Sequence, residues 1–318
     1  MSNLTFPGAI QYVYDLIPGD YVNNPDVTSA TKLYMSSSRT VLQPQFDTSS
    51  VTDMTRMFSG CYSLIGVGMF DTSSCTDMTG MFNTCKALLT VPHFDTSNVT
   101  TMYEMFNGCE KLCEVPHFDT SKVTSMYSTF QNCKRLLNLP LFDTSKVTNM
   151  QMICYGCNFL TEFPPFDTSN VTNMRYLVAD CKELKTFHQI NTSNVTDVQY
   201  MFQSCLSLKS VPLLDFGKVT TMGYLFGTST MSCLTDLGGF KDLGKGTTSS
   251  ISGSTSYFLS NCSNLTHESL MNVINNLYDR KGNGMTTVVS LKFGSTNLNK
   301  LTDEEKAIAT NKGFTLTT

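Results

Sequence analysis

A strictly periodic phrase runs through the middle of this chain and limits the folds open to it. The tetrapeptide Phe-Asp-Thr-Ser recurs at 24-residue intervals without slippage, opening at Phe46, Phe70, Phe94, Phe118, Phe142 and Phe166. Ile190 and Leu214 keep the same register with looser matches. A period of this length is typical of a solenoid, in which each repeat forms one coil stacked on the last. We therefore predict one elongated solenoid of about eight coils with a cap at each end.

The period also divides the chain into segments. Clean repeats fill residues 46–237, and a degenerate coil precedes them, because Val27-Thr28 lies one full period before Val51-Thr52. Residues 1–45 are therefore expected to form an N-terminal cap with that degenerate coil. Residues 238–264 are predicted to be an irregular insertion with a last degenerate coil, and residues 265–318 a C-terminal α/β cap.

One repeat, from Phe94 to His117, predicts the structure of a coil. Met102, Met105, Phe106 and Cys109 are spaced i, i+3, i+4 and i+7, as on the apolar face of a short helix. The segment from Leu112 through Pro116 reads as a short extended stretch that lies parallel to its counterparts in neighbouring coils. The predicted fold class is therefore an α/β repeat, a leucine-rich-repeat-like solenoid.

Seven of the twelve cysteines occupy one position of the repeat, which we call a slot: Cys61, Cys85, Cys109, Cys133, Cys157, Cys181 and Cys205. Stacked coils would place them in a column with about 4.8 Å between neighbouring Cα atoms. Parallel Cβ vectors do not suit disulfide geometry, and seven is an odd number. We predict a column of buried, free thiols that pack as small apolar side chains. Disulfides between neighbours, or a bound metal, are the alternatives.

An aspartate follows the first apolar residue of nearly every repeat: Asp47, Asp71, Asp95, Asp119, Asp143, Asp167 and Asp215, with Asn191 in the remaining coil. Asp before Thr-Ser favours an Asx turn, in which the carboxylate accepts backbone N–H groups. We predict this local role for the row. Calcium bound between coils is the alternative, although the corner has one Asp and no glycine-rich loop.

The run from Phe94 to Pro116, Phe-Asp-Thr-Ser-Asn-Val-Thr-x-Met-x-x-Met-Phe-x-Gly-Cys-x-x-Leu-x-x-Val-Pro, resembles the repeat of BspA-like leucine-rich-repeat proteins. These are bacterial surface proteins that also occur in mycoplasmas and some protists. The match covers about Phe46 to Leu237, nearly two thirds of the chain. The resemblance implies a leucine-rich-repeat-like solenoid with an adhesive or recognition role and no enzyme.

The tail after Leu265 is not periodic. Leu270, Val273, Ile274 and Leu277 predict a helical face, and residues 288–293 a strand. Thr302 with Glu305 is a capping box that opens a helix ending at Gly313, before a final strand in residues 314–318. The tail weakly resembles repeat proteins of gut bacteria and their bacteriophages.

Composition argues against several functions. With 22 Lys plus Arg against 26 Asp plus Glu, the chain lacks the basic stripe that nucleic-acid binding needs. We find no run of about 20 apolar residues for membrane insertion and no recognisable signal peptide. The pair His93 and His117 lacks a third ligand in its slot, and Cys154 with Cys157 is a lone CxxC, so we predict no metal, no cofactor and no catalytic residue.

Contact residues are expected where coils differ. The two residues after the first Met slot vary most and carry five tyrosines: Tyr103, Tyr127, Tyr176, Tyr200 and Tyr224. Exposed tyrosine loses little conformational entropy on binding. We predict that these residues contact a ligand, either a protein partner or a surface glycan. Ordinary packing between adjacent coils is the alternative.

These observations favour a non-enzymatic binding or structural protein. The leading hypothesis is a bacteriophage virion component, such as a fibre, tail or head accessory protein, which contacts other virion proteins and needs no signal peptide. The alternative is a secreted or cell-surface bacterial adhesin that binds host protein or glycan. The expected location is therefore the virion or the extracellular surface.

Overall fold

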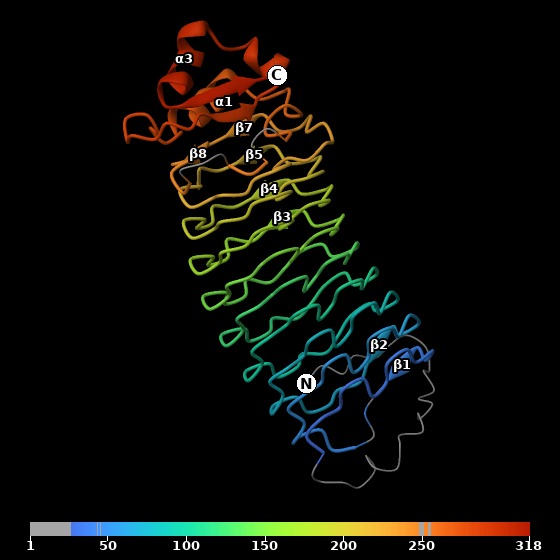
Figure 1. Cartoon of the computed structure of the whole chain (residues 1–318). Helices are drawn as coiled ribbons and strands as arrows, with labels where there is room; N and C mark the ends of the chain where they lie inside the picture. The colour runs from blue at the N-terminus through green and yellow to red at the C-terminus, as the bar shows by residue number, and fades with distance from the viewer. Residues whose placement is uncertain (1–26, 43, 45, 248–250, 254–255) are drawn as a thin grey trace.

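The chain folds into an elongated stack of coils closed by a small α/β unit at its C-terminal end (Figure 1). The computed structural model describes residues 27–42, 44, 46–247, 251–253 and 256–318. The N-terminal cap predicted for residues 1–45 therefore lies partly outside the described residues. The predicted leucine-rich-repeat-like solenoid is confirmed.

A single column of parallel β-bridges runs the length of the stack. It links Ser29, Asp53, Asp77, Thr101, Ser125, Asn149, Asn173, Asp197, Thr221 and Ser252 in succession. Each step is one repeat long until the last, from Thr221 to Ser252, which is longer because of an insertion. The column thus joins ten coils among the described residues, two more than the eight expected from the clean repeats. The additional coils are the degenerate ones at the two ends.

The strands are short and parallel. In the solenoid they are β1 (Val41–Leu42), β2 (Gly66–Val67), β3 (Glu162–Phe163), β4 (Thr186–Phe187), β5 (Ser210–Val211), β6 (Leu214–Asp215), β7 (Asp236–Leu237) and β8 (Phe240–Lys241). They pair as β1–β2, β3–β4, β5–β7 and β6–β8. In each pair a residue meets its counterpart one coil later, as Phe163 meets Phe187, so the register follows the repeat.

The helical segment predicted within each coil is wrong: the segment is a series of tight turns. Alternate N–H groups bond to the next coil, as Arg56 N does to Thr79 O (2.8 Å), while Met57 N closes a turn onto Met54 O (3.2 Å). Arg56 adopts a left-handed conformation with φ of 55°. An α-helix would direct its N–H groups along its own axis and leave few for neighbouring coils. The apolar spacing resembles that of a helix because both structures turn every three to four residues.

The core consists of like residues stacked on like. Phe58, Phe82 and Phe106 are fully buried and stack with ring centroids 5.3 and 5.6 Å apart. The seven slot cysteines are buried, as predicted, and none of them forms a disulfide. Each thiol donates to a carbonyl of the preceding coil, as Cys109 Sγ does to Phe82 O at 3.1 Å. Cysteine therefore suits this slot because it is small and apolar and carries a weak donor.

The tail forms the two predicted helices, α1 (His267–Asn275) and α3 (Asp303–Asn311), and the two predicted strands, β9 (Val289–Lys292) and β10 (Phe314–Thr317). A short helix that was not predicted, α2 (Ser295–Leu298), lies between β9 and α3. Leu270, Val273 and Ile274 form the buried apolar face of α1. The Thr302–Glu305 capping box opens α3 as predicted, and β10 pairs in parallel with β9. This unit covers the last coils (Figure 1).

Candidate ligand-contact surface

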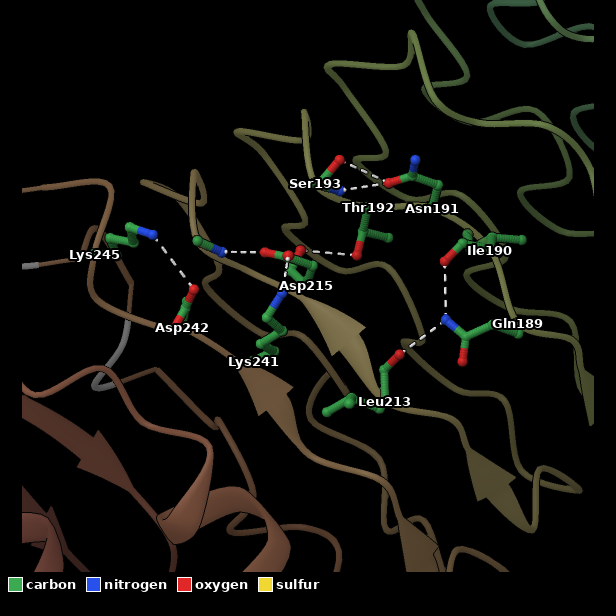
Figure 2. Close-up of polar contacts among 11 residues, drawn as sticks. Gln189, Ile190, Asn191, Thr192, Ser193, Leu213, Asp215, Lys241, Asp242 and Lys245 are labelled. Atoms are coloured by element: carbon green, nitrogen blue, oxygen red, sulfur yellow. Dashed lines mark hydrogen bonds and ion pairs between the residues drawn. The ribbon is translucent and has the colours of Figure 1, made fainter.

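The aspartate row forms Asx turns, as predicted. In each coil the side-chain oxygen accepts the backbone N–H two residues on, for example Asp119 Oδ1 from Ser121 N at 3.0 Å. Asn191 does the same for Ser193 N at 3.0 Å, and Asp215 for Gly217 N at 2.9 Å (Figure 2). The following threonine, such as Thr192, is buried and donates to the backbone carbonyl of the next coil's Asx residue (2.8 Å). One side-chain oxygen of each residue in the row is thus bonded within its own turn, as predicted.

The other candidate metal ligands do not form a set of three. Cys154 and Cys157 are both buried, and their side chains contact each other. His117 Nε2 lies 3.2 Å from Leu141 O. Within the described part of the chain, no three His, Cys, Asp or Glu side chains gather closely enough to hold a metal ion.

The five predicted tyrosines fall into two groups. Tyr103 and Tyr127, which we call the tyrosine pair, stack with centroids 4.6 Å apart. Tyr176, Tyr200 and Tyr224 form a second stack with spacings of 4.5 and 5.0 Å and interplanar angles of 3°. The two groups lie in different columns because the pair follows the Met slot directly, whereas the others come one residue later. The stripe is therefore not continuous as the sequence suggested.

The second stack is longer than the repeat predicts. Tyr257 extends it, with its ring centroid 5.4 Å from that of Tyr224. Tyr224 N donates to Ser256 O, so Tyr257 occupies the same slot in the last coil. We call Tyr176, Tyr200, Tyr224 and Tyr257 the tyrosine column. Tyr257 was not predicted from the sequence, because the insertion in the last coil breaks the register of the repeat.

Backbone conformation fixes the direction of the column. All four tyrosines adopt left-handed φ values, of 55°, 58°, 58° and 51° in chain order. This region is unusual for a bulky side chain and occurs here because the slot is the third residue of a tight turn. The rings of Tyr176, Tyr200 and Tyr224 are nearly parallel and half-buried, whereas that of Tyr257 is exposed and tilted by 29° from Tyr224.

Two neighbours complete the surface. The Arg175 guanidinium lies 5.4 Å from the ring centroid of Tyr176 and 5.9 Å from that of Tyr200. Tyr155 meets Tyr176 edge-on at 5.6 Å. Burial, with a smaller contribution from Tyr176 and Tyr224, raises the pKa of Tyr200, so the phenol is neutral at physiological pH. The 24-residue period did not predict the contacts of Arg175 and Tyr155 with the column, because both depend on side-chain conformations between adjacent coils.

The stacking restricts what the column can bind. Rings 4.5 to 5.0 Å apart and nearly parallel cover each other's flat faces. A sugar that stacks on an aromatic ring needs such a face. What the column presents is a ridge of ring edges and phenolic hydroxyls beside a guanidinium. Such a ridge offers apolar contact and hydrogen bonds together.

Comparison with known proteins identifies the repeat. A family model described as "Mycoplasma protein of unknown function, DUF285" matches residues 28–138 and 135–237. The chain belongs to this family, whose repeats occur in BspA-like surface proteins, and the resemblance seen in the sequence is confirmed. A leucine-rich repeat protein from Bacteroides ovatus is similar in structure, with a TM-score of 0.37 and 14% identity over 90% of this chain and 83% of that one. No curated protein matches the chain.

Proposed function

We propose that this member of the DUF285 family is a non-enzymatic binding protein that contacts a protein partner through the tyrosine column. A leucine-rich-repeat-like solenoid is the fold of a binding or structural repeat protein. The observation that carries the proposal is the column itself, four aligned tyrosines beside Arg175. Tyrosine and arginine are enriched among the residues that dominate binding energy at protein interfaces.

A protein partner fits this surface better than a glycan does. The ring faces are occupied by neighbouring rings, which leaves edges and hydroxyls for contact. The rings are already held in place, so binding costs little side-chain entropy. A surface glycan remains the second ligand class and forms one arm of the test below.

We also propose that the protein has no catalytic activity. A catalytic site requires converging titratable groups in a cleft. The polar side chains of the coil corners instead bond to their own or the neighbouring backbone, as Ser97 N does to Asp95 Oδ1 at 3.0 Å.

Two settings are proposed for the binding. The first is a bacteriophage virion, in which the protein contacts other virion proteins or the host surface. The weak resemblance of the tail to repeat proteins of gut phages supports it. The second is a bacterial surface adhesin, which the family's occurrence in BspA-like surface proteins supports. Detection of the protein in purified particles, or in material shaved from intact cells, distinguishes the two.

The binding proposal is tested on intact cells. Labelled protein is applied to cells after protease treatment or after periodate oxidation of surface glycans. We expect protease to abolish binding and periodate to leave it unchanged. The reverse pattern would assign the surface to a glycan. Absence of binding to untreated cells and to isolated particles alike would refute the proposal.

A further inference from the structure

A second surface lies on a different side of the coil, where the short strands run. We define the strand face as residues 89–93, 113–117, 137–141, 161–165, 185–189 and 209–213. Four leucines on it are exposed by 42, 48, 58 and 40%: Leu89, Leu137, Leu141 and Leu213. Cys113 is exposed in the column between Leu89 and Leu137. A shallow pocket of about 310 Å³ lies beside Leu141, Pro164 and Pro165.

The two edges of the strand face carry opposite charge. Where the chain enters the face, a basic row comprises Lys111, Lys134, Arg135, Lys182, Lys185 and Lys209. Where it leaves, an acidic row comprises Asp71, Asp95, Asp119, Asp143, Asp167 and Asp215. Glu110 and Glu183 interrupt the basic row, Glu114 and Glu162 lie beside it on the strand face, and Lys122, Lys146 and Lys218 lie beside the acidic row. An excess of one sign remains at each edge.

Most of these charges have no ion-pair partner among the residues that the structure describes. Two do: Lys134 pairs with Glu110 (2.9 Å) and Asp215 with Lys241 (3.2 Å). No ion pair within the described chain involves Lys111, Arg135, Lys182, Lys185 or Lys209. The same holds for Asp71, Asp95, Asp119, Asp143 and Asp167. The rows are therefore available to interact with charges on another molecule.

The charge pattern of one copy of the strand face is complementary to that of a second copy in only one of two symmetric arrangements. A two-fold axis parallel to the long axis of the solenoid exchanges the two edges, so it places each acidic row opposite a basic row. A two-fold axis across the solenoid would place like rows opposite each other. We infer that the strand face binds a second copy of this chain, side by side and in the same direction. The exposed leucines of the two strand faces then lie within the same interface.

The strand face alone is smaller than a standard interface. Five extended residues span about 16 Å across it, and six coils span about 29 Å along it. These dimensions give roughly 460 Å² per copy against the ~800 Å² per partner of a standard interface, so the dimer must also bury the charged rows on either side of the face. A closed two-fold interface is also the commonest form of homo-oligomer. Such a dimer leaves both tyrosine columns outside the interface.

The chain itself supplies variants that keep the fold. Asn191 fills the aspartate slot and makes the same Asx turn, so Asp95→Asn, Asp119→Asn and Asp143→Asn remove charge alone. Lys185 and Gln189 occupy the slots of Leu137 and Leu141, so Leu137→Lys with Leu141→Gln removes apolar surface. The matched control changes Asp53, Asp77 and Asp197 to Asn, because Asn149 and Asn173 fill that bridge-column slot.

Sedimentation equilibrium of the full chain at 50 mM salt is the test. We expect a species of twice the 35.2 kDa of one chain, whose dissociation constant rises at least tenfold in the acidic-row variant and in the leucine variant. Raising salt to 1 M should weaken the dimer similarly, since the rows act through exposed charges. The control variant should dimerise as the wild type does. A monomer at every concentration up to 0.5 mM, or equal weakening by the control, would overturn the inference.

The direction of packing has its own test. Lys111→Glu, Arg135→Glu and Lys182→Glu reverse the basic row, in which Glu110 and Glu183 already stand. Mixed with the wild type, this variant should form heterodimers more weakly than the wild type forms homodimers, because its new glutamates face aspartates. Heterodimers tighter than the homodimer would mean that like rows face each other, and would contradict the parallel arrangement.

Discussion

Single residues recur in this repeat because each makes one particular contact between or within coils. The buried threonine after each aspartate donates to the next coil's backbone, as Thr96 Oγ1 does to Asp119 O at 2.9 Å. The slot cysteine donates to the coil before it, as Cys133 Sγ does to Phe106 O at 3.1 Å. Buried polar groups are tolerated when they are bonded in this way. The sequence alone predicted the Asx turns and the buried thiols, because both follow from residue type and period.

Burial should separate the cysteines by reactivity. Burial raises the pKa of the Cys109, Cys133 and Cys205 thiols above the ordinary value and that of Cys75 to about 12, so almost no thiolate forms at pH 8. Cys113 and Cys233 are the two exposed thiols. We expect a thiol reagent to label these two in the native protein and all twelve after unfolding without reductant. Mass spectrometry of labelled peptides checks this, and fewer than six free thiols after unfolding would contradict the free-thiol column.

The Asx turn predicts a pH dependence. The bond from Ser121 N–H to Asp119 holds the pKa of that carboxyl below its ordinary 3.8. The stabilisation it provides is therefore complete above that value and is lost as pH falls through the lower folded-state pKa. Asp119→Asn should keep stability at pH 7 and melt with less dependence on pH below 4. Asp119→Ala should lose about 1 kcal/mol at pH 7. Equal stability of the Ala and Asn variants in thermal melts would show that the bond contributes nothing.

Among the secondary-structure elements, the turns of the coil were the part that sequence could not predict. The spacing of Met102, Met105, Phe106 and Cys109 fits a helix and a series of turns equally well. What decides between them is hydrogen bonding between coils, which no single repeat contains. The residues with left-handed backbone conformation could not be predicted either, because glycine fills only some of their slots. Gly60, Gly108 and Gly156 have φ near 75°. Thr84 occupies the same slot with φ of 59°.

Thr84 should therefore be a site of local strain. A β-branched residue at positive φ is disfavoured, whereas glycine adopts that conformation freely. We expect Thr84→Gly to raise the free energy of unfolding by roughly 1 kcal/mol. The matched control is Gly108→Thr, which should lower it, since an added Cβ would lie 3.3 Å from Thr84 Cα. Urea denaturation measures both, and a destabilised Thr84→Gly variant would show that the threonine side chain outweighs the backbone strain.

At the scale of the molecule, the period predicted the solenoid and the non-periodic tail predicted the C-terminal helices and strands, while the arrangement of the tyrosines is seen only in the structure. Tyr127 and Tyr200 occupy adjacent positions of the repeat, and this difference of one residue places their rings in different stacks. Tyr257 joins the column across an insertion that hides it from the repeat. The helices that the structure describes are too short or too polar to cross a bilayer. The stack carries an aromatic column and a strand face with opposite charges at its two edges, and these are the surfaces that we propose for a protein partner and for a second copy of the chain.

The most direct measurement of the central claim is the affinity for the cell-surface or virion partner before and after Tyr200→Ser, with Tyr127→Ser, which lies outside the tyrosine column, as the control. Ser128 occupies the slot of Tyr200 with φ of 53°, so the backbone tolerates serine there. We expect Tyr200→Ser to lower binding at least tenfold, because the column loses one of its two inner rings, while the melting temperature drops by less than about 4 °C. Unchanged binding with a large drop in melting temperature would mean that the tyrosines only seal the gaps between coils.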